Sequence, residues 1–420
     1  MHIRLWSTGE IVTSSKFGKI SEIHYNALGF ETYSETLGWQ GQFLKSSTKY
    51  DPATLKVKQQ IKPHYDVEVN TYTDYEYDDP FQRVSAKKVF DWYVRLTTEY
   101  AYDNANGIVT ITAPDGTQSS SKTNALGEII SRTDEGGVIT YTYNALSKPI
   151  RIETNGSVTT IVYDAATGNL TERSDLKNGR NETFAYDNLD RLTHAYLNGV
   201  LQHEMSYLPN GNIDEKSDVG IYRYDANNKP NAMRGIDGTT GVGISNEKQF
   251  ITYTAFNKIS SVAQGINKSN ITHRYNIEYG LDQQRIKSQY YDNGKLRLTR
   301  YYFGSYEKDI DEFGNITETD YIYTPAGLMA IVRNAGEFFY IHTDRQGSLE
   351  RITNANGNIV SEYTYTAWGS RILLSGTNIT DRGYTGHEHL TALGLINMNG
   401  RVYDPVLARF LSPDPYSTGA

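Results

Sequence analysis

The chain has 420 residues, no Cys, 34 Tyr and a formal net charge of -8 at pH 7. The lack of Cys excludes disulfides and thiolate metal sites, and we expect no cofactor and no metal site. The 41 basic and 49 acidic residues form no long like-charge run, which argues against a nucleic-acid partner. No window approaches the ~18 apolar residues of a spanning helix, and the first residues do not resemble a signal peptide, so we expect no membrane insertion.

Residues 1–100 contain scattered copies of a short motif, a Tyr followed by Asn or Asp, at Tyr25, Tyr50 and Tyr77. These copies match the motif of the rest of the chain only loosely. We therefore predict a divergent N-terminal region of β-repeats over residues 1–100.

Residues 101–300 carry the same motif at a regular spacing. Its full copies, together with degenerate copies such as Thr123-Asn124 and Tyr207-Leu208, have anchors at positions 102, 123, 143, 163, 186, 207 and 224, separated by 21, 20, 20, 23, 21 and 17 residues. The flanks 137–143 and 157–163 alternate β-branched or aromatic residues with polar ones, which is typical of strands. Each unit of about twenty residues is predicted to form a β-hairpin.

The turn motif has a physical basis. The Asn or Asp after Tyr can accept hydrogen bonds from the backbone two residues on, and the Gly four or five residues after Tyr tolerates a positive φ. The Tyr closes the preceding strand, with its ring on a neighbouring hairpin and its hydroxyl on a hydrogen-bond partner or water. Because lone hairpins are barely stable, the copies should add side by side into a long sheet, which predicts an all-β fold without long helices.

The Tyr-Asp hairpins resemble YD repeats, and the C-terminal part of the chain is similar to the RHS repeat-associated core. Residues 301–420 are therefore predicted to form that core. The style of the sequence resembles that of bacterial, Bacteroidetes-like members. The core resemblance is carried by residues 301–307 (YYFGSYE), 342–349 (HTDRQGSL), 365–369 (YTAWG), 384–389 (YTGHEH) and 394–415 (GLINMNGRVYDPVLARFLSPDP).

The resemblance implies a spiralling β-sheet that forms a partial hollow shell, with the core as a cap at one end. It implies a secreted or cell-surface protein that encapsulates and presents a C-terminal effector, often a toxin, together with other RHS or secretion-system chains as partners. Family members release the effector by self-cleavage at an aspartyl-protease-like site in the core. By the same resemblance, the chain is expected to be truncated at its C-terminal end and to lack the cargo.

The family motif for self-cleavage corresponds to Arg401, Asp404 and Asp414. Two carboxyl groups suit peptide hydrolysis, because one can hold a proton while the other activates water, and a guanidinium can keep one of them ionised. The spacing alone favours a different reading, since an Asp before Pro is usually a turn residue. The family usually has Gly where Ala408 stands, which predicts a turn that requires positive φ.

Other functions remain open on the sequence. Exposed Trp39, Trp92 and Trp368 could stack on cell-surface glycans in an adhesion or carbohydrate-binding module, and an inactive structural remnant is a third interpretation. The pair His387 and His389 could in principle bind a metal, but a structural role in the core motif is favoured.

Overall fold

The computed structural model consists of strands and short 3-10 turns, and none of the residues it describes lies in an α-helix. The chain divides into two compact units, one of residues 1–123 with 333–337 and one of residues 124–332 with 338–420. None of the helical segments among the described residues has the length and apolar character needed to cross a bilayer. The structure describes residues 2–5, 10–15, 18–37, 43–64, 72–91, 94–134, 137–154, 157–176, 179–225, 229–238, 247–280, 283–324, 327–334, 336–344 and 346–413.

The first unit is a succession of antiparallel strands, each paired with the next along the chain. Its hairpins follow the sequence order without a crossover. The strands are β1 (His2–Leu5), β2 (Glu10–Ser15), β3 (Gly18–Tyr25), β4 (Glu31–Leu37), β5 (Phe43–Tyr50), β6 (Val57–His64), β7 (Tyr72–Glu76), β8 (Ala86–Asp91), β9 (Val94–Asp103), β10 (Ile108–Thr112) and β11 (Gln118–Thr123).

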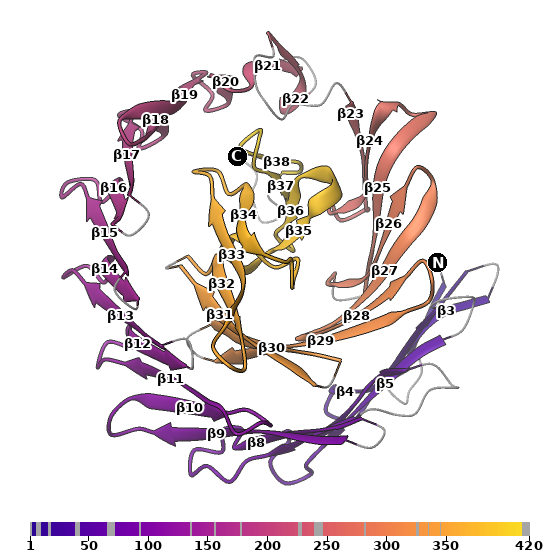
Figure 1. The fold of residues 1–420 in the computed structure, drawn as a ribbon. Coiled ribbons are helices and arrows are strands. Elements are labelled where there is room, and N and C mark those ends of the chain that lie inside the picture. The colour runs from indigo at the N-terminus through magenta and orange to yellow at the C-terminus, as the bar shows by residue number, and fades with distance from the viewer. Residues whose placement is uncertain are drawn as a thin grey trace. The chain divides into compact units, whose positions relative to one another are not determined.

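The second unit begins with eleven strands that also pair in chain order, called here the repeat strip. These strands follow an arc, magenta in Figure 1. They are β12 (Ile129–Asp134), β13 (Gly137–Tyr143), β14 (Pro149–Thr154), β15 (Ser157–Tyr163), β16 (Leu170–Asp175), β17 (Arg180–Tyr186), β18 (Leu192–Leu197), β19 (Val200–Tyr207), β20 (Ile213–Lys216), β21 (Gly220–Asp225) and β22 (Lys229–Asp237).

A twelve-stranded sheet follows, again in chain order. Its burial is strongest around Ile331, Leu349 and Ile352, whose side chains are fully buried. The strands are β23 (Lys248–Tyr253), β24 (Ile259–Asn267), β25 (Asn270–Tyr279), β26 (Arg285–Asp292), β27 (Lys295–Phe303), β28 (Tyr306–Asp311), β29 (Ile316–Thr324), β30 (Gly327–Arg333), β31 (Glu337–Thr343), β32 (Leu349–Asn354), β33 (Ile359–Tyr365) and β34 (Arg371–Gly376).

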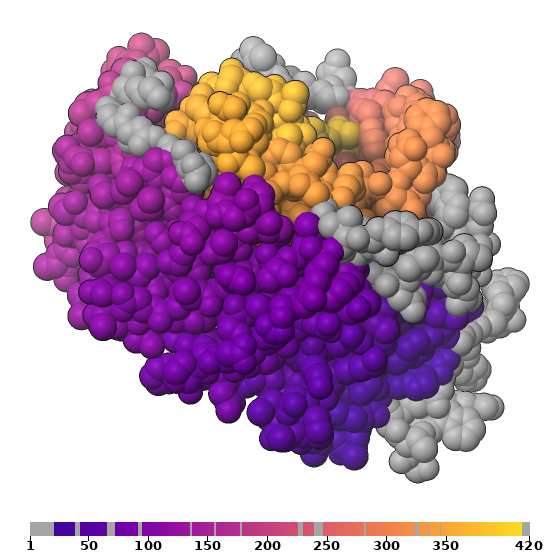
Figure 2. Space-filling view, turned by 60° about the horizontal axis from the view of Figure 1, so that its bottom comes forward, coloured from indigo at the N-terminus to yellow at the C-terminus, as the bar shows by residue number. Residues whose placement is uncertain are grey.

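The last described residues form a small four-stranded sheet, called here the cap. In Figure 1 the cap, in yellow, lies on the inner side of the arc of the repeat strip. In Figure 2 the orange and yellow residues of the second unit lie between its magenta strip and its salmon strands. The cap elements are η2 (Tyr384–Gly386), β35 (Glu388–Leu390), η3 (Thr391–Leu393), β36 (Leu395–Asn397), β37 (Val402–Asp404) and β38 (Arg409–Phe410).

The predicted turn mechanism is confirmed in the strip. Strands β13, β15, β17 and β19 each end at the Tyr of the motif. After Tyr143, Asn144 Oδ1 accepts hydrogen bonds of 3.0 Å from the N–H groups of Leu146 and Lys148. Gly168 adopts the positive φ that the motif requires, at 74°. Where Gly is missing, another residue takes this conformation, as Ser147 does with φ 57°.

The Tyr hydroxyl of the motif links neighbouring hairpins. Tyr143 donates a hydrogen bond of 2.7 Å to the carbonyl of Ile129, Tyr186 one of 2.8 Å to Leu170, and Tyr207 one of 2.7 Å to Leu192. The same contact recurs in the second sheet, where Tyr365 donates to the carbonyl of Leu349 over 2.7 Å. Each of these Tyr hydroxyls therefore fastens its own turn to the backbone of the preceding hairpin, a partner that the sequence had left open.

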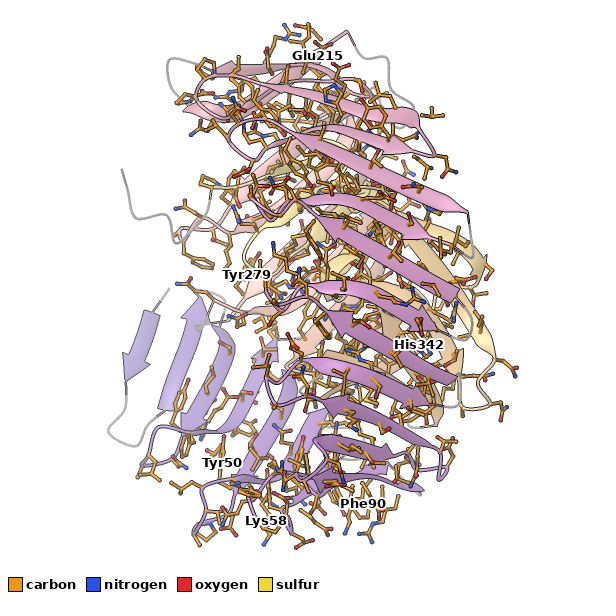
Figure 3. The ribbon with its side chains drawn as sticks, turned by 90° about the vertical axis from the view of Figure 1, so that its left-hand side faces the viewer. Tyr50, Lys58, Phe90, Glu215, Tyr279 and His342 are labelled. Atoms are coloured by element: carbon orange, nitrogen blue, oxygen red, sulfur yellow. The ribbon has the colours of Figure 1, made fainter. Side chains whose placement is uncertain are left out.

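Side chains of the repeat strip also meet the second sheet directly. His342 on β31, labelled in Figure 3, has Nδ1 3.4 Å from Asp134 Oδ2 on β12, and its Nε2 is 3.1 Å from Thr353 Oγ1. Arg132, also on β12, donates a hydrogen bond of 3.1 Å to Thr343 Oγ1. Burial lowers the pKa of His342 to about 4, and the positive charges of Arg351 and Arg132 act in the same direction.

Candidate functional site

Asp404 ends β37 in the cap and is buried. Its Oδ1 accepts hydrogen bonds of 3.0 Å from Val406 N–H and 2.9 Å from Leu407 N–H, so it caps the turn that leads to β38. Its Oδ2 accepts a hydrogen bond of 3.2 Å from the side-chain amide of Gln249 on β23. Oδ1 therefore stabilises the following turn, as expected of an Asp before Pro. Oδ2 instead binds a side chain of a different sheet.

The environment of Asp404 disfavours its charge. Burial raises the pKa of Asp404 above its ordinary value, and the hydrogen bonds from Leu407, Gln249 and Val406 and the charge of Lys216 only partly offset this effect. Lys216 on β20 is itself almost fully buried, and burial lowers its pKa. A carboxyl group in such a setting can hold a proton closer to neutral pH than an exposed Asp, which suits general acid or base chemistry.

A cavity of about 1610 Å³ lies against this carboxyl group. Its wall includes Arg401, Asp404 and Gln249, and it also includes Ser412 and Pro413, the last residues that the structure describes. The backbone that leads toward position 414 therefore starts at the wall that carries Asp404. The space is large enough for an extended peptide segment of several residues.

The three residues predicted as catalytic have different outcomes. Asp404 and Arg401 line the same cavity, but the guanidinium of Arg401 lies over the ring of Phe410, 3.7 Å from its centroid. Asp414 lies outside the described residues. The catalytic roles of Arg401, Asp404 and Asp414 therefore stay a prediction, with Asp404 placed at a cavity.

The turn between β37 and β38 has the conformation expected from the family pattern. Ala408 adopts a φ of 52°, in the left-handed region that Gly occupies without strain. Next to it, the side chain of Leu407 is buried in an apolar cluster with Met205, Ile213 and Tyr222 of the strip. Tyr222 also donates a hydrogen bond of 2.9 Å to the carbonyl of Leu407. Packing thus holds the turn in place despite the strained residue.

A buried ionic cluster fixes the other end of the cap. Glu388 on β35 accepts hydrogen bonds from Arg285, from Arg300 over 2.8 Å and from Tyr302 over 2.9 Å. Burial alone would raise the pKa of Glu388, but the charges of Arg285, Arg300 and Arg382 hold it well below its usual range. The cluster joins the cap to β26 and β27.

His389, one of the two histidines considered as metal ligands, has a structural contact. Its Nε2 accepts a hydrogen bond of 3.0 Å from the backbone N–H of Tyr384. Burial lowers the pKa of His389 to about 3, so the ring is neutral near pH 7. Burial also lowers the pKa of His387. The structural interpretation of this pair is therefore favoured by the contacts of His389.

Of the three tryptophans considered for glycan stacking, Trp39 and Trp92 lie outside the described residues. Trp368 packs against the apolar cluster of Met205, Ile213 and Leu407. This ring contributes to the contact between strip and cap.

Sequence reasoning missed several residues of the site, namely Lys216, Tyr222, Gln249 and Arg409. Gln249 and Asp404 are 155 residues apart, and no local pattern connects them. The sequence did offer one indication for Arg409, because this cation lies within the core motif that resembles the family. Its contacts lie on the strip, at Tyr224 and Asn231.

Comparison with known proteins places the chain in a family. A sequence model of the family described as Teneurin YD-shell matches residues 18–419. Teneurin-3 of Danio rerio is 25% identical over 435 residues, which cover 94% of this chain and 15% of that protein. The tRNA3(Ser)-specific nuclease WapA of Bacillus spizizenii is 26% identical over 274 residues, which cover 63% of this chain and 10% of that protein. The chain thus spans only a small part of these relatives.

A solved structure shares the fold. The crystal structure of TcdB2-TccC3 without its hypervariable C-terminal region matches 97% of this chain and 26% of that chain, with a TM-score of 0.55 and 14% identity. These findings confirm the resemblance to YD-repeat and RHS proteins and the all-β fold of long antiparallel sheets. Because the family match runs over almost the whole sequence, the chain belongs to the Teneurin YD-shell family.

Proposed function

We propose that this chain is the shell and core module of a secreted or cell-surface protein that encloses and presents a C-terminal polypeptide effector. In this proposal residues 301–420 are the core, residues 101–300 the repeat sheet and residues 1–100 a divergent extension of it. The core cleaves the chain beyond Asp404, with Asp404, Asp414 and Arg401 as the catalytic groups. Other RHS or secretion-system chains are proposed as partners that deliver the module.

The proposal rests on one observation: Asp404 and the last described residue, Pro413, line the same cavity. A chain that continues past Pro413 therefore starts at the wall of the cavity that holds the buried carboxyl group. The raised pKa of Asp404 supports a role in proton transfer to the scissile peptide. In the hydrolysis, water adds to the peptide carbonyl and gives up a proton to one carboxylate, while the leaving amine receives a proton from the other carboxyl group.

The relatives support a separable C-terminal effector. The aligned part of the Bacillus spizizenii protein is 10% of its length, and that protein is named as a tRNA-specific nuclease. The matching TcdB2-TccC3 protein was crystallised without a C-terminal region that is described as hypervariable. Both relatives suit a constant β module that is combined with a variable polypeptide, and we extend this arrangement to the present chain.

The proposal is tested by intact-mass analysis of the chain with a reporter polypeptide fused after Ala420. We expect two products whose masses add to that of the full chain plus one water, and a single uncleaved mass for Asp404→Asn. A matched control is Asp115→Asn, which changes a carboxylate in an exposed turn of the first unit. A single mass for the parent chain would contradict self-cleavage and leave a structural shell. Cleavage that persists in Asp404→Asn would remove Asp404 from the mechanism.

A further inference from the structure

The turns of the repeat end in a residue that reaches the next turn. This closing residue directly follows the positive-φ residue, and in several turns it is a cation. Lys148 Nζ lies 5.1 Å from the ring centroid of Tyr163 and donates a hydrogen bond of 2.6 Å to the carbonyl of Gly168. Lys258 does the same with the Tyr279 ring, at 5.4 Å, and the carbonyl of Gln283, at 2.6 Å.

These contacts define a repeated cation position. The closing cation covers the ring of the next motif Tyr and binds a carbonyl of the turn that follows this Tyr. In the first unit Lys56 makes both contacts in the same way, with the ring of Tyr77 and the carbonyl of Gln82. A cation over an aromatic face and a charge-assisted hydrogen bond are both stabilising.

At Tyr224 the strip lacks its own cation at this position. The preceding turn has its positive-φ residue at Gly211, with φ 86°, and its closing residue is Asn212. Asn212 has a short neutral side chain, whose Nδ2 donates a hydrogen bond of 3.0 Å to the carbonyl of Pro230. It does not bring a charge to the Tyr224 ring.

Arg409 of the cap occupies the vacant position. Its guanidinium lies 5.1 Å from the centroid of the Tyr224 ring, and Nη1 donates a hydrogen bond of 2.6 Å to the Tyr224 hydroxyl. Nη2 donates one of 2.9 Å to the carbonyl of Asn231, in the segment after the Tyr224 turn, and one of 3.4 Å to Asn212 Oδ1. Arg409 thus makes the two contacts that the closing Lys makes elsewhere in the repeat.

We propose that Asn212, Tyr224 and Asn231 form a receptor for Arg409, by which the repeat strip selects the site where the cap docks. Asn212 is the specificity residue, because it leaves the cation position of the repeat empty for a cation from the cap. Arg409 is a positioning residue for Asp404, since the two are paired partners in the register of β37 and β38. The docking role does not depend on the proposed self-cleavage.

The substitution Asn212→Lys tests this receptor, because it restores the cation of the repeat and leaves no place for Arg409. We expect amide hydrogen exchange of residues 402–411 to become roughly tenfold faster, the size of effect typical of a partly buried cation–π contact with its hydrogen bonds. Arg409→Ala should give a similar increase, and the double variant should give no more than either single change. Additive effects in the double variant, or unchanged exchange in Asn212→Lys, would overturn the proposal.

The strip offers a matched control at Asn169, which is also the closing residue of a turn, after Gly168. Its Nδ2 donates a hydrogen bond of 2.8 Å to Asp190 Oδ1 in the next turn. Asn169→Lys makes the same chemical change and should leave the exchange of residues 402–411 unchanged. Asn212→Ser removes the amide without adding a cation. It therefore distinguishes the effect of a cation at this position from general damage to the turn, and residues 402–411 should keep most of their protection against exchange. If Asn212→Ser or Asn169→Lys exposed residues 402–411 as much as Asn212→Lys, the specificity assigned to residue 212 would be wrong.

Discussion

The side-chain amide of Gln249 donates a hydrogen bond of 3.2 Å to Oδ2 of Asp404, and thereby connects the first strand of the second sheet to the cap. The other carboxylate oxygen is held by two backbone N–H groups of the following turn. Both oxygens of this buried carboxyl group are therefore fixed in direction. Since the amide hydrogen bond favours the ionised form, Gln249 moderates the increase of the Asp404 pKa that burial causes.

Gln249→Leu should move the pH profile of self-cleavage to higher pH. The substitution removes a donor to the carboxylate, so the pKa of Asp404 rises further, and any limb of the profile that reports this group follows it. The measurement is the cleavage rate of the reporter fusion between pH 4 and pH 9. Gln264→Leu is the control, because Gln264 lines the same cavity. A profile that shifts equally in both variants would show that the polarity of the cavity, and not the hydrogen bond, sets the pKa.

Ala408→Gly should stabilise the protein. Ala408 has a φ of 52°, and an L-residue with a Cβ pays roughly 1 kcal/mol in this region while Gly does not. We expect the free energy of unfolding to rise by about 0.5–1 kcal/mol, measured by urea denaturation. Ala185→Gly on β17 is the control. It should lower the free energy of unfolding, because Gly within a strand is less stable than Ala by about 0.5–1 kcal/mol. Destabilisation by both substitutions would contradict the strain at Ala408.

Tyr207→Phe should weaken the repeat strip by removing one inter-hairpin hydrogen bond. The hydroxyl of Tyr207 donates to the carbonyl of Leu192 over 2.7 Å, while the ring remains under the guanidinium of Arg191. The expected loss is about 1 kcal/mol in the free energy of unfolding. Tyr323→Phe removes a hydroxyl from a side chain that is 52% exposed and should change stability by less than about 0.5 kcal/mol. Equal effects would show that the hydroxyl bridge adds nothing to the strip.

The repetitive part of the fold follows from the sequence because its interactions are local. The motif Tyr, its Asx residue and the positive-φ position lie within six residues, and the strand ends at Tyr143 and Tyr163 agree with this pattern. The closing cation was also present in the sequence, as Lys148 and Arg191 directly after the positive-φ residue. Its contact with the next Tyr could not be seen there, because the distance between successive turns depends on how the hairpins pair.

The contacts of the cap could not be predicted in the same way. Glu388 meets Arg285, which is 103 residues away, and Arg409 meets Tyr224, which is 185 residues away. Such contacts depend on the tertiary arrangement of the second unit, which no local pattern of the sequence reveals. The family resemblance supplied Asp404 as a candidate site residue, but neither its burial nor its bond to Gln249.

Glu388→Gln should strongly destabilise the second unit. The neutral side chain leaves the buried guanidinium groups of Arg285 and Arg300 without their shared counter-charge. Breaking one partner of a buried ion pair typically costs about 3–5 kcal/mol, and we expect a loss of this size by urea denaturation. Asp237→Asn is the control, because its pair with Arg223 is exposed on both sides and should contribute less than about 1 kcal/mol. A loss for Glu388→Gln as small as that of the control would mean that the buried ionic cluster contributes little to the stability of the second unit.

A second cavity, of about 420 Å³, is lined in part by the carboxyl group of Glu350. Glu350 has a side chain exposed to this cavity, between strands of the repeat strip and of the second sheet. Desolvation by these strands raises the pKa of Glu350 to about 7, and the charge of Asp344 adds to the increase. Asp175 acts in the same direction, while Arg173 and Arg351 oppose it.

Glu350→Gln should therefore stabilise the protein increasingly as the pH rises from about 4.5 to about 7, and fully above pH 7. An acid whose folded-state pKa is raised destabilises the fold when it ionises, so the penalty is absent below pH 4.5, grows up to about pH 7 and is complete above it. The difference in the free energy of unfolding between Glu350→Gln and the parent should be near zero at pH 4 and favour the variant at pH 8. Glu350→Asp keeps an ionisable carboxyl group on the same strand and should retain the pH dependence of the parent. A stability difference that does not change between pH 4 and pH 8 would show that water in the cavity screens the charge of Glu350 completely.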